Sequence, residues 1–161
     1  MSDSNVRSMN LAVFLTSCGN YHHEGWRHPE AWVDGSTNIQ RWIEMARIAE
    51  DAKLDMLFIA DQIAIVGGDE LSAIENSSKV NRFEPMTLLS ALTAHTKKIG
   101  LAGTCATSYS EPYTVARMFA SLDHLSGGRA AWNCVTGGQK EEAQNFNLER
   151  HAIHGERYER A

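Results

Sequence analysis

Residues 99–138 read IGLAGTCATSYSEPYTVARMFASLDHLSGGRAAWNCVTGG, and this stretch decides the fold. It begins with an apolar run from Ile99 to Thr107 and ends with a second from Arg129 to Thr136. Between the two runs, Glu111 to Leu125 has a helical pattern that opens on Glu-Pro and stops at a Gly-Gly pair. A strand, a helix and a strand in this order predict a parallel pair of strands joined by a right-handed crossover.

The residues before this stretch repeat the same alternation. Two earlier apolar runs, Met9 to Ser17 and Asp55 to Asp61, are predicted as strands. Two segments with helical spacing, Asn38 to Lys53 and Glu84 to Thr96, are predicted as helices. The segments Cys18 to Ser36 and Gln62 to Phe83 are predicted as loops, and the charged tail from Gln139 to Ala161 as partly helical. Repeated strand–helix units predict an α/β fold with a parallel sheet, either an open doubly wound sheet or a (β/α)8 barrel.

Phosphate-binding motifs are absent from the chain. The first predicted strand runs into Thr16 to Gly19 with no GxGxxG, and GxxxxGK[ST] occurs nowhere. The pattern therefore favours the barrel slightly over a nucleotide-binding open sheet. Residues 1–8 are predicted to be a disordered lead-in, and residues 9–161 to form one domain that supplies about the first four βα units of a barrel.

Composition excludes several classes of partner. The formal net charge of −5 is spread along the chain, which argues against nucleic acid and anionic membrane surfaces. No apolar run approaches the roughly 18 residues that a membrane span needs. The three cysteines, Cys18, Cys105 and Cys134, have long and unlike spacings that fit neither a disulfide framework nor a zinc site. We therefore expect a reducing cytoplasm and no metal.

Hydrogen-bonding side chains follow the predicted strands at the points where they end. Because ligands bind at the carboxyl ends of parallel strands in either architecture, these residues are expected to gather on one rim: Thr16, Ser17, His22, His23, Asp61, Thr107, Ser108, Tyr109, Asn133 and Thr136. Apolar walls with a few placed donors and acceptors suit a polar heterocycle.

Structural roles compete with binding roles at several of these positions. Asp61 is equally suited to cap a following helix, and Ser108 favours a turn or cap. Asn133 lies inside an apolar strand, where an unpaired amide costs about 1–3 kcal/mol, so we expect a ligand or a hydrogen-bond network there. The neighbouring Trp132 is expected in the core.

Two groups of histidines allow different interpretations. His22, His23 and His28 lie in a loop without metal-ligand spacing, which favours an active-site loop over a metal site. His154 and Tyr158 are four residues apart and would share one helix face. That face is suited to a phosphate or a ring edge, and equally to solvent.

The quoted stretch resembles the bacterial-luciferase-like flavin monooxygenases, and within them the nitrilotriacetate, EDTA and dibenzothiophene-sulfone monooxygenase group. Four other segments are similar to this family, so that the resemblance covers Met9 to Ala161: MNLAVFLTSCGNYHHEGWRHPEA, AEDAKLDMLFIAD, RFEPMTLLSALTAHTKKIGL and EAQNFNLERHAIHGERYERA.

The resemblance implies a truncated (β/α)8 barrel, a homo-oligomer, and reduced FMN supplied by a separate NAD(P)H-dependent flavin reductase. The substrate would be a small organic molecule that contains sulfur or amine and carboxylate groups. The flavin would carry the redox chemistry, while the protein binds, orients and excludes water. Two alternatives remain open: a non-catalytic half-barrel remnant, and a flavin- or deazaflavin-binding protein of the wider superfamily.

The resemblance also assigns roles to individual residues. Asp61, Thr107 and Asn133 match flavin-contacting positions at the ends of the second, third and fourth strands. His154 and Tyr158 match the His and Tyr of an HxxRY segment that reaches the phosphate side of FMN. His23 is the candidate catalytic residue, a loop group near the flavin or the substrate.

Overall fold

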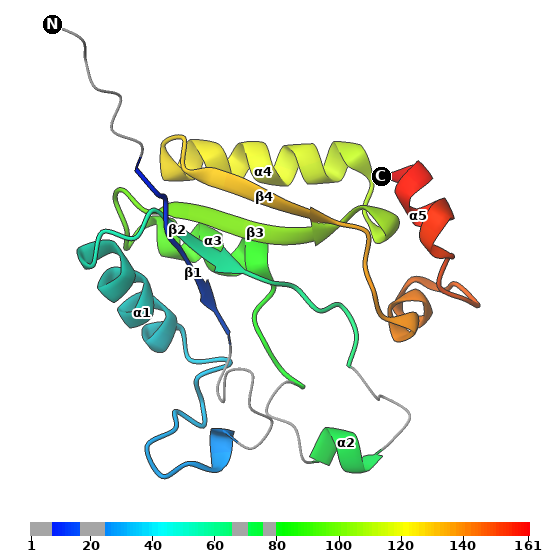
Figure 1. Ribbon diagram of the computed structural model, residues 1–161, viewed down its shortest axis with the longest axis horizontal. Helices are drawn as coiled ribbons and strands as arrows, with labels where there is room; N and C mark the ends of the chain where they lie inside the picture. Colours follow the sequence, from blue (N-terminus) through cyan, green and yellow to red (C-terminus); the bar gives the residue numbers. More distant parts are fainter. Residues whose placement is uncertain (1–7, 17–24, 66–70, 76–79) are drawn as a thin grey trace, which may run out of the picture.

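The computed structural model describes residues 8–16, 25–65, 71–75 and 80–161 (Figure 1). Its centre is a parallel four-stranded sheet in the order β1-β2-β3-β4. The strands are β1 (Ala12–Leu15), β2 (Met56–Ile59), β3 (Gly100–Ala106) and β4 (Ala130–Val135). Three long helices connect them: α1 (Ile39–Asp51), α3 (Pro85–Thr93) and α4 (Pro112–Ser126). The alternation predicted from the sequence is confirmed. The predicted lead-in falls almost wholly in residues 1–7, outside the described part.

Shorter elements lie in the connections at the carboxyl ends of the strands. They are η1 (Gly25–Arg27), α2 (Leu71–Glu75), η2 (Thr107–Tyr109), η3 (Lys140–Phe146) and α5 (His154–Arg160). The interpretation of residues 62–83 as loop alone was wrong, because α2 lies within them. The partly helical tail is confirmed by η3 and α5. Figure 1 shows α5 beside the amino-terminal end of α4.

Local sequence signals set the ends of the long helices. The side chain of Asn38 accepts a hydrogen bond from the backbone N–H of Gln40 before α1. Glu84 accepts from two backbone N–H groups at the start of α3, where Pro85 occupies the first helical position. Helix α4 ends at Gly127, whose φ of 70° is a left-handed conformation that suits glycine.

The hydrophobic core lies between the sheet and these helices. Its fully buried side chains include Ala46 on α1, Leu57 on β2, Leu89 on α3, Leu101 on β3 and Leu122 on α4. Gly103 allows α3 to approach β3 closely, since a Cβ atom there would lie 3.0 Å from both Leu89 Cδ1 and Met86 Sδ. The core thus fixes the sheet from one face and leaves the other face to the site described below.

The amino-terminal end of the sheet is held by two charged side chains. Glu50 Oε1 accepts from the backbone N–H groups of residues 97–99, at 2.6 to 3.0 Å. Arg129 donates to Thr96 Oγ1, to the Thr96 carbonyl and to the Ile99 carbonyl, at 2.8 to 3.2 Å. These bonds join α1, the α3–β3 loop and the start of β4 at the end opposite the strands' carboxyl termini.

The expectation that Trp132 belongs to the core was wrong. Its side chain is 44% exposed, although the indole packs on Phe119 and Nε1 donates to the Cys105 carbonyl at 3.1 Å. The physical reason is that β4 has a neighbouring strand on one side only, so α4 covers its outer face incompletely.

Among the described residues, no helix combines the length and the hydropathy required to cross a bilayer.

Candidate functional site

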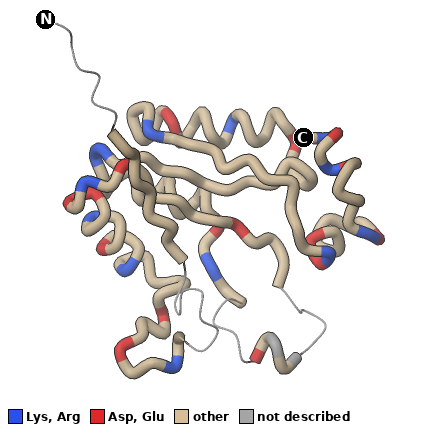
Figure 2. The backbone as a smooth tube through the Cα atoms, viewed as in Figure 1, with Lys and Arg blue, Asp and Glu red and all other residues tan. Residues whose placement is uncertain are grey.

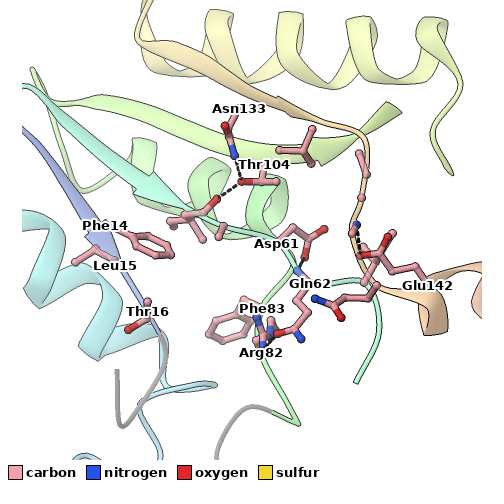
Figure 3. A pocket seen from close by; sticks show the side chains of 18 of the residues that line it. Phe14, Leu15, Thr16, Asp61, Gln62, Arg82, Phe83, Thr104, Asn133 and Glu142 are labelled. Atoms are coloured by element: carbon pink, nitrogen blue, oxygen red, sulfur yellow. Dashed lines mark hydrogen bonds between the residues drawn. The ribbon is translucent and has the colours of Figure 1, made fainter. Parts of the chain in front are cut away.

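A cavity of about 510 Å³ lies where the four strands end (Figure 3). Its walls are mostly apolar and aromatic, with contributions from Phe14, Leu15, Trp42, Ile59, Phe83 and Val135. Polar side chains complete the lining: Thr16, Asp61, Gln62, Arg82, Thr104, Asn133, Gln139 and Glu142. Every strand contributes residues to this lining, as expected for a site at the carboxyl ends of a parallel sheet.

Asn133 is held in one orientation by its neighbour on β3. Thr104 and Asn133 are paired in register, and Asn133 Nδ2 donates to Thr104 Oγ1 at 3.0 Å. The Thr104 hydroxyl in turn donates to the Ile59 carbonyl at 3.0 Å. Because a carbonyl only accepts, the hydroxyl proton is committed to Ile59, and the amide must present its NH2 group to Thr104. This leaves Asn133 Oδ1 as an acceptor for a ligand. Thr104, only 5% exposed, was not singled out from the sequence.

Asp61 lies directly beyond β2 on the same rim. Its Oδ1 accepts from the Gln62 backbone N–H at 2.8 Å, and no helix begins within residues 61–65, so the helix-cap interpretation was wrong. Burial raises the pKa of the Asp61 carboxyl above its ordinary value, and the charges of Glu84 and Glu142 act in the same direction. The Gln62 N–H and the charge of Arg82 oppose this shift.

Arg82 completes this part of the rim. Its Nη2 donates to Gln62 Oε1 at 2.9 Å, and burial lowers the pKa of its guanidinium. Figure 3 shows Arg82 and Phe83 on the side of the cavity opposite Asn133. The rim therefore carries both a carboxylate and a guanidinium around the aromatic walls.

The raised pKa of Asp61 predicts a pH-dependent effect of Asp61→Asn. The pKa of Asp61 is higher in the folded protein than in the unfolded chain. The contribution of Asp61 to the free energy of unfolding is therefore complete below the pKa of the unfolded chain, and it is lost as the pH rises through the pKa of the folded protein. We therefore expect Asp61→Asn to melt a few degrees higher than the unchanged protein at about pH 7 and at the same temperature at about pH 3. Thermal unfolding followed by circular dichroism checks this, and a lower melting temperature for Asp61→Asn at neutral pH would contradict it.

Thr107 and Ser108 tie the end of β3 to the end of β4. Thr107 Oγ1 donates to the Val135 carbonyl at 3.2 Å, and Ser108 Oγ to the Thr136 carbonyl at 2.7 Å. Thr107 is not part of the lining of the large cavity. It lines a second, more apolar cavity of about 460 Å³ between α4, Trp132 and the end of α5.

His154 and Tyr158 share one face of α5, as the spacing predicted. Their rings stack with centroids 4.5 Å apart, both side chains are exposed, and neither lines the large cavity. Arg160 Nε donates to the Thr107 carbonyl at 3.2 Å and holds α5 beside η2. The structure thus brings Asp61 and Asn133 into one cavity and places Thr107 and α5 beyond the end of β3. His23 lies outside the described residues.

Comparison with known proteins decides the family. Residues 9–161 match the family described as luciferase-like monooxygenase. The chain belongs to this family. N-acetyl-S-(2-succino)cysteine monooxygenase of Bacillus subtilis (strain 168) is 48% identical over 158 residues, which are 98% of this chain and 34% of that protein. Nitrilotriacetate monooxygenase component A of Aminobacter aminovorans is 45% identical over 161 residues, 96% of this chain and 35% of that protein.

Solved structures confirm the architecture of this luciferase-like chain. EDTA monooxygenase from Chelativorans sp. BNC1 superposes with a TM-score of 0.84 at 33% identity, over 96% of this chain and 36% of that one. Long-chain alkane monooxygenase superposes with a TM-score of 0.86 at 32% identity, over 96% and 36% respectively. The chain spans about a third of the length of the relatives it matches, and it folds as four βα units of a luciferase-like (β/α)8 barrel.

Glu142 is a cavity residue of this luciferase-like chain that the sequence did not point to. It lies on η3 and is 5% exposed. Its Oε1 accepts from the Gly138 N–H at 3.4 Å, while Oε2 is buried without a hydrogen-bond partner among the described residues. Gly137 leaves space for this carboxylate, because a Cβ at that position would collide with Oε2. A glutamate in a charged tail gives no sign in sequence that it will be buried.

Proposed function

We propose that the complete protein is a flavin-dependent monooxygenase that uses reduced FMN and O2 to oxidise a small organic substrate containing sulfur or amine and carboxylate groups. The observation that carries this proposal is the aromatic cavity at the strand ends, into which Thr104 orients the Asn133 amide. Family membership supports it, as do relatives named as monooxygenases. Riboflavin lyase, 32% identical with a TM-score of 0.86, is described with a modified FMN and riboflavin.

The residues of the cavity fit a flavin. An isoalloxazine ring has apolar faces and polar edges that carry N–H donors and several acceptors, which matches apolar walls with a few placed polar groups. Phe14 and Phe83 would contact the ring, and Asn133 Oδ1 would accept from one of its N–H groups. When bound, the reduced flavin supplies the electrons that activate O2.

The protein's own part in this reaction is binding, orientation and proton management. Asp61 retains a proton to higher pH than an ordinary aspartate, so it is suited to hold a proton near the reacting edge of the ring. Thr107, His154 and Tyr158 would lie toward the phosphate end of the cofactor, and His23 near the substrate. The apolar walls would keep water away from the reacting edge of the ring.

The proposal includes partners. "Component A" in the name of the nitrilotriacetate relative supports a two-component system, in which a separate NAD(P)H-dependent reductase delivers reduced FMN. We further propose a homo-oligomer in the cytoplasm.

An oxygen-uptake experiment tests the proposal. The complete protein is supplied with FMN, NADH and a flavin reductase, and O2 consumption and products are followed with nitrilotriacetate, N-acetyl-S-(2-succino)cysteine and dibenzothiophene sulfone. We expect reduced FMN to bind and at least one substrate to be oxygenated. Failure to bind reduced FMN would contradict the proposal and favour a non-catalytic half-barrel remnant. Turnover with reduced deazaflavin in its place would favour the deazaflavin alternative.

A further inference from the structure

We propose that Glu142 is a specificity-determining residue that selects substrates carrying an ammonium group. The inference rests on the proposed function, because it assigns the flavin and the substrate to different parts of one cavity. Figure 3 shows Glu142 extending from η3 toward the cavity, on the side where Asp61 also lies.

The unpartnered oxygen of Glu142 is the first argument. Its side chain is 5% exposed, and the hydrogen bond that its Oε1 accepts from the Gly138 N–H is long at 3.4 Å. Oε2 is buried without a partner among the described residues. A buried carboxylate oxygen without a donor is costly, and a donor supplied by a ligand removes that cost. The occupant of this part of the cavity therefore carries an N–H or O–H group.

The charge around Glu142 shows which kind of donor fits best. Asp61 lies on the same rim, and the charges of Glu84 and Glu142 both favour its protonated form. Arg82 is the cationic side chain among the described residues that line the cavity, and its Nη2 donates to Gln62 Oε1. A hydroxyl would satisfy Oε2 and leave the negative charge of Glu142 unchanged. An ammonium group both donates to Oε2 and offsets the charge of Glu142, whereas an anionic group at this one position would be repelled by it.

The flavin does not meet these requirements, so we assign this position to the substrate. FMN carries no cationic group, and its phosphate is an anion that Glu142 would repel. An N–H of its ring would have a separate acceptor in Asn133 Oδ1, which Thr104 orients from β3. Glu142 lies on η3, beyond the end of β4, and is free to serve a second ligand.

A binding experiment with matched probes tests the inference without requiring turnover. Benzylamine and benzyl alcohol have nearly the same shape and differ in the ammonium group. The affinity of each for the complete protein is measured by calorimetry at neutral pH. We expect benzylamine to bind about tenfold more tightly or better, and Glu142→Gln to abolish this preference. Glu141→Gln, the same change one residue away, should preserve it, because Glu141 does not line the cavity and pairs with Lys140.

The outcomes separate this inference from the proposed function. Equal affinity of the unchanged protein for the two probes, or a preference that survives Glu142→Gln, would overturn the role of Glu142 even if FMN binds normally. A benzylamine preference that depends on Glu142, in a protein that does not bind FMN, would uphold the amine site and overturn the monooxygenase. Glu142→Asp keeps the charge, and an amine preference greater than that of Glu142→Gln is expected, which distinguishes lost charge from a disturbed fold.

Discussion

Replacement of Asn133 by leucine is expected to weaken FMN binding by about ten- to a hundredfold. The substitution keeps the volume of the side chain and removes the acceptor that Thr104 directs toward the ligand. A polar edge of the flavin would then be buried against a methyl group with no partner, and the cost of an unpaired polar group is about 1–3 kcal/mol. Quenching of tryptophan fluorescence during FMN titration measures the effect, since Trp42 lines the cavity.

Two threonine variants serve as the controls for this prediction. Thr104→Val removes the hydroxyl that orients Asn133, so it should also weaken FMN binding, and its effect should not add to that of Asn133→Leu. Thr93→Val is the same chemical change at a hydroxyl that donates to the Ser90 carbonyl within α3, away from the cavity. Thr93→Val should leave FMN affinity unchanged. Fully additive effects of Asn133→Leu and Thr104→Val would show that the two residues act independently and would contradict the positioning role.

The largest effect on stability is expected for Leu122→Ala. Leu122 lies on the buried face of α4 and is fully buried in the core, so truncation leaves a cavity that costs about 2–5 kcal/mol of the free energy of unfolding. Urea denaturation followed by circular dichroism measures the change.

Leu125→Ala is the matched control on the same helix. Its side chain is 64% exposed, so the same truncation removes little buried area, and the change should stay within about 0.5 kcal/mol. Similar losses for the two variants would contradict the description of α4 as a helix with one buried face.

The strands and long helices could be predicted because their signals are local. The apolar run from Ile99 to Thr107, the Glu-Pro that opens α4 and the glycines that end it each act within a few residues. The exposure of Trp132 could not be predicted in this way, because it depends on the position of β4 at the edge of the sheet. Helix α2 was missed because five residues carry too little periodicity to distinguish them from loop.

The site was predictable where a residue's position in a strand sufficed. Asp61 and Asn133 were found because strand ends converge in a parallel sheet, and both line the cavity. Thr104 was missed because its role depends on the register between β3 and β4, which brings it next to Asn133. Glu142 was missed because its burial depends on the return of η3 to the sheet. Both omissions concern contacts between segments that are not set by local sequence.

The two ends of the sheet have separate roles, and this separation affects how the protein can change during evolution. Glu50 and Arg129 hold the amino-terminal end through hydrogen bonds, while the cavity residues lie at the other end. Substitutions at the rim of the cavity can therefore accumulate without weakening the hydrogen bonds of Glu50 and Arg129. A lineage that exchanges Glu142 or Arg82 for other side chains can acquire a new substrate specificity on the same fold, and a protein engineer can make the same exchanges.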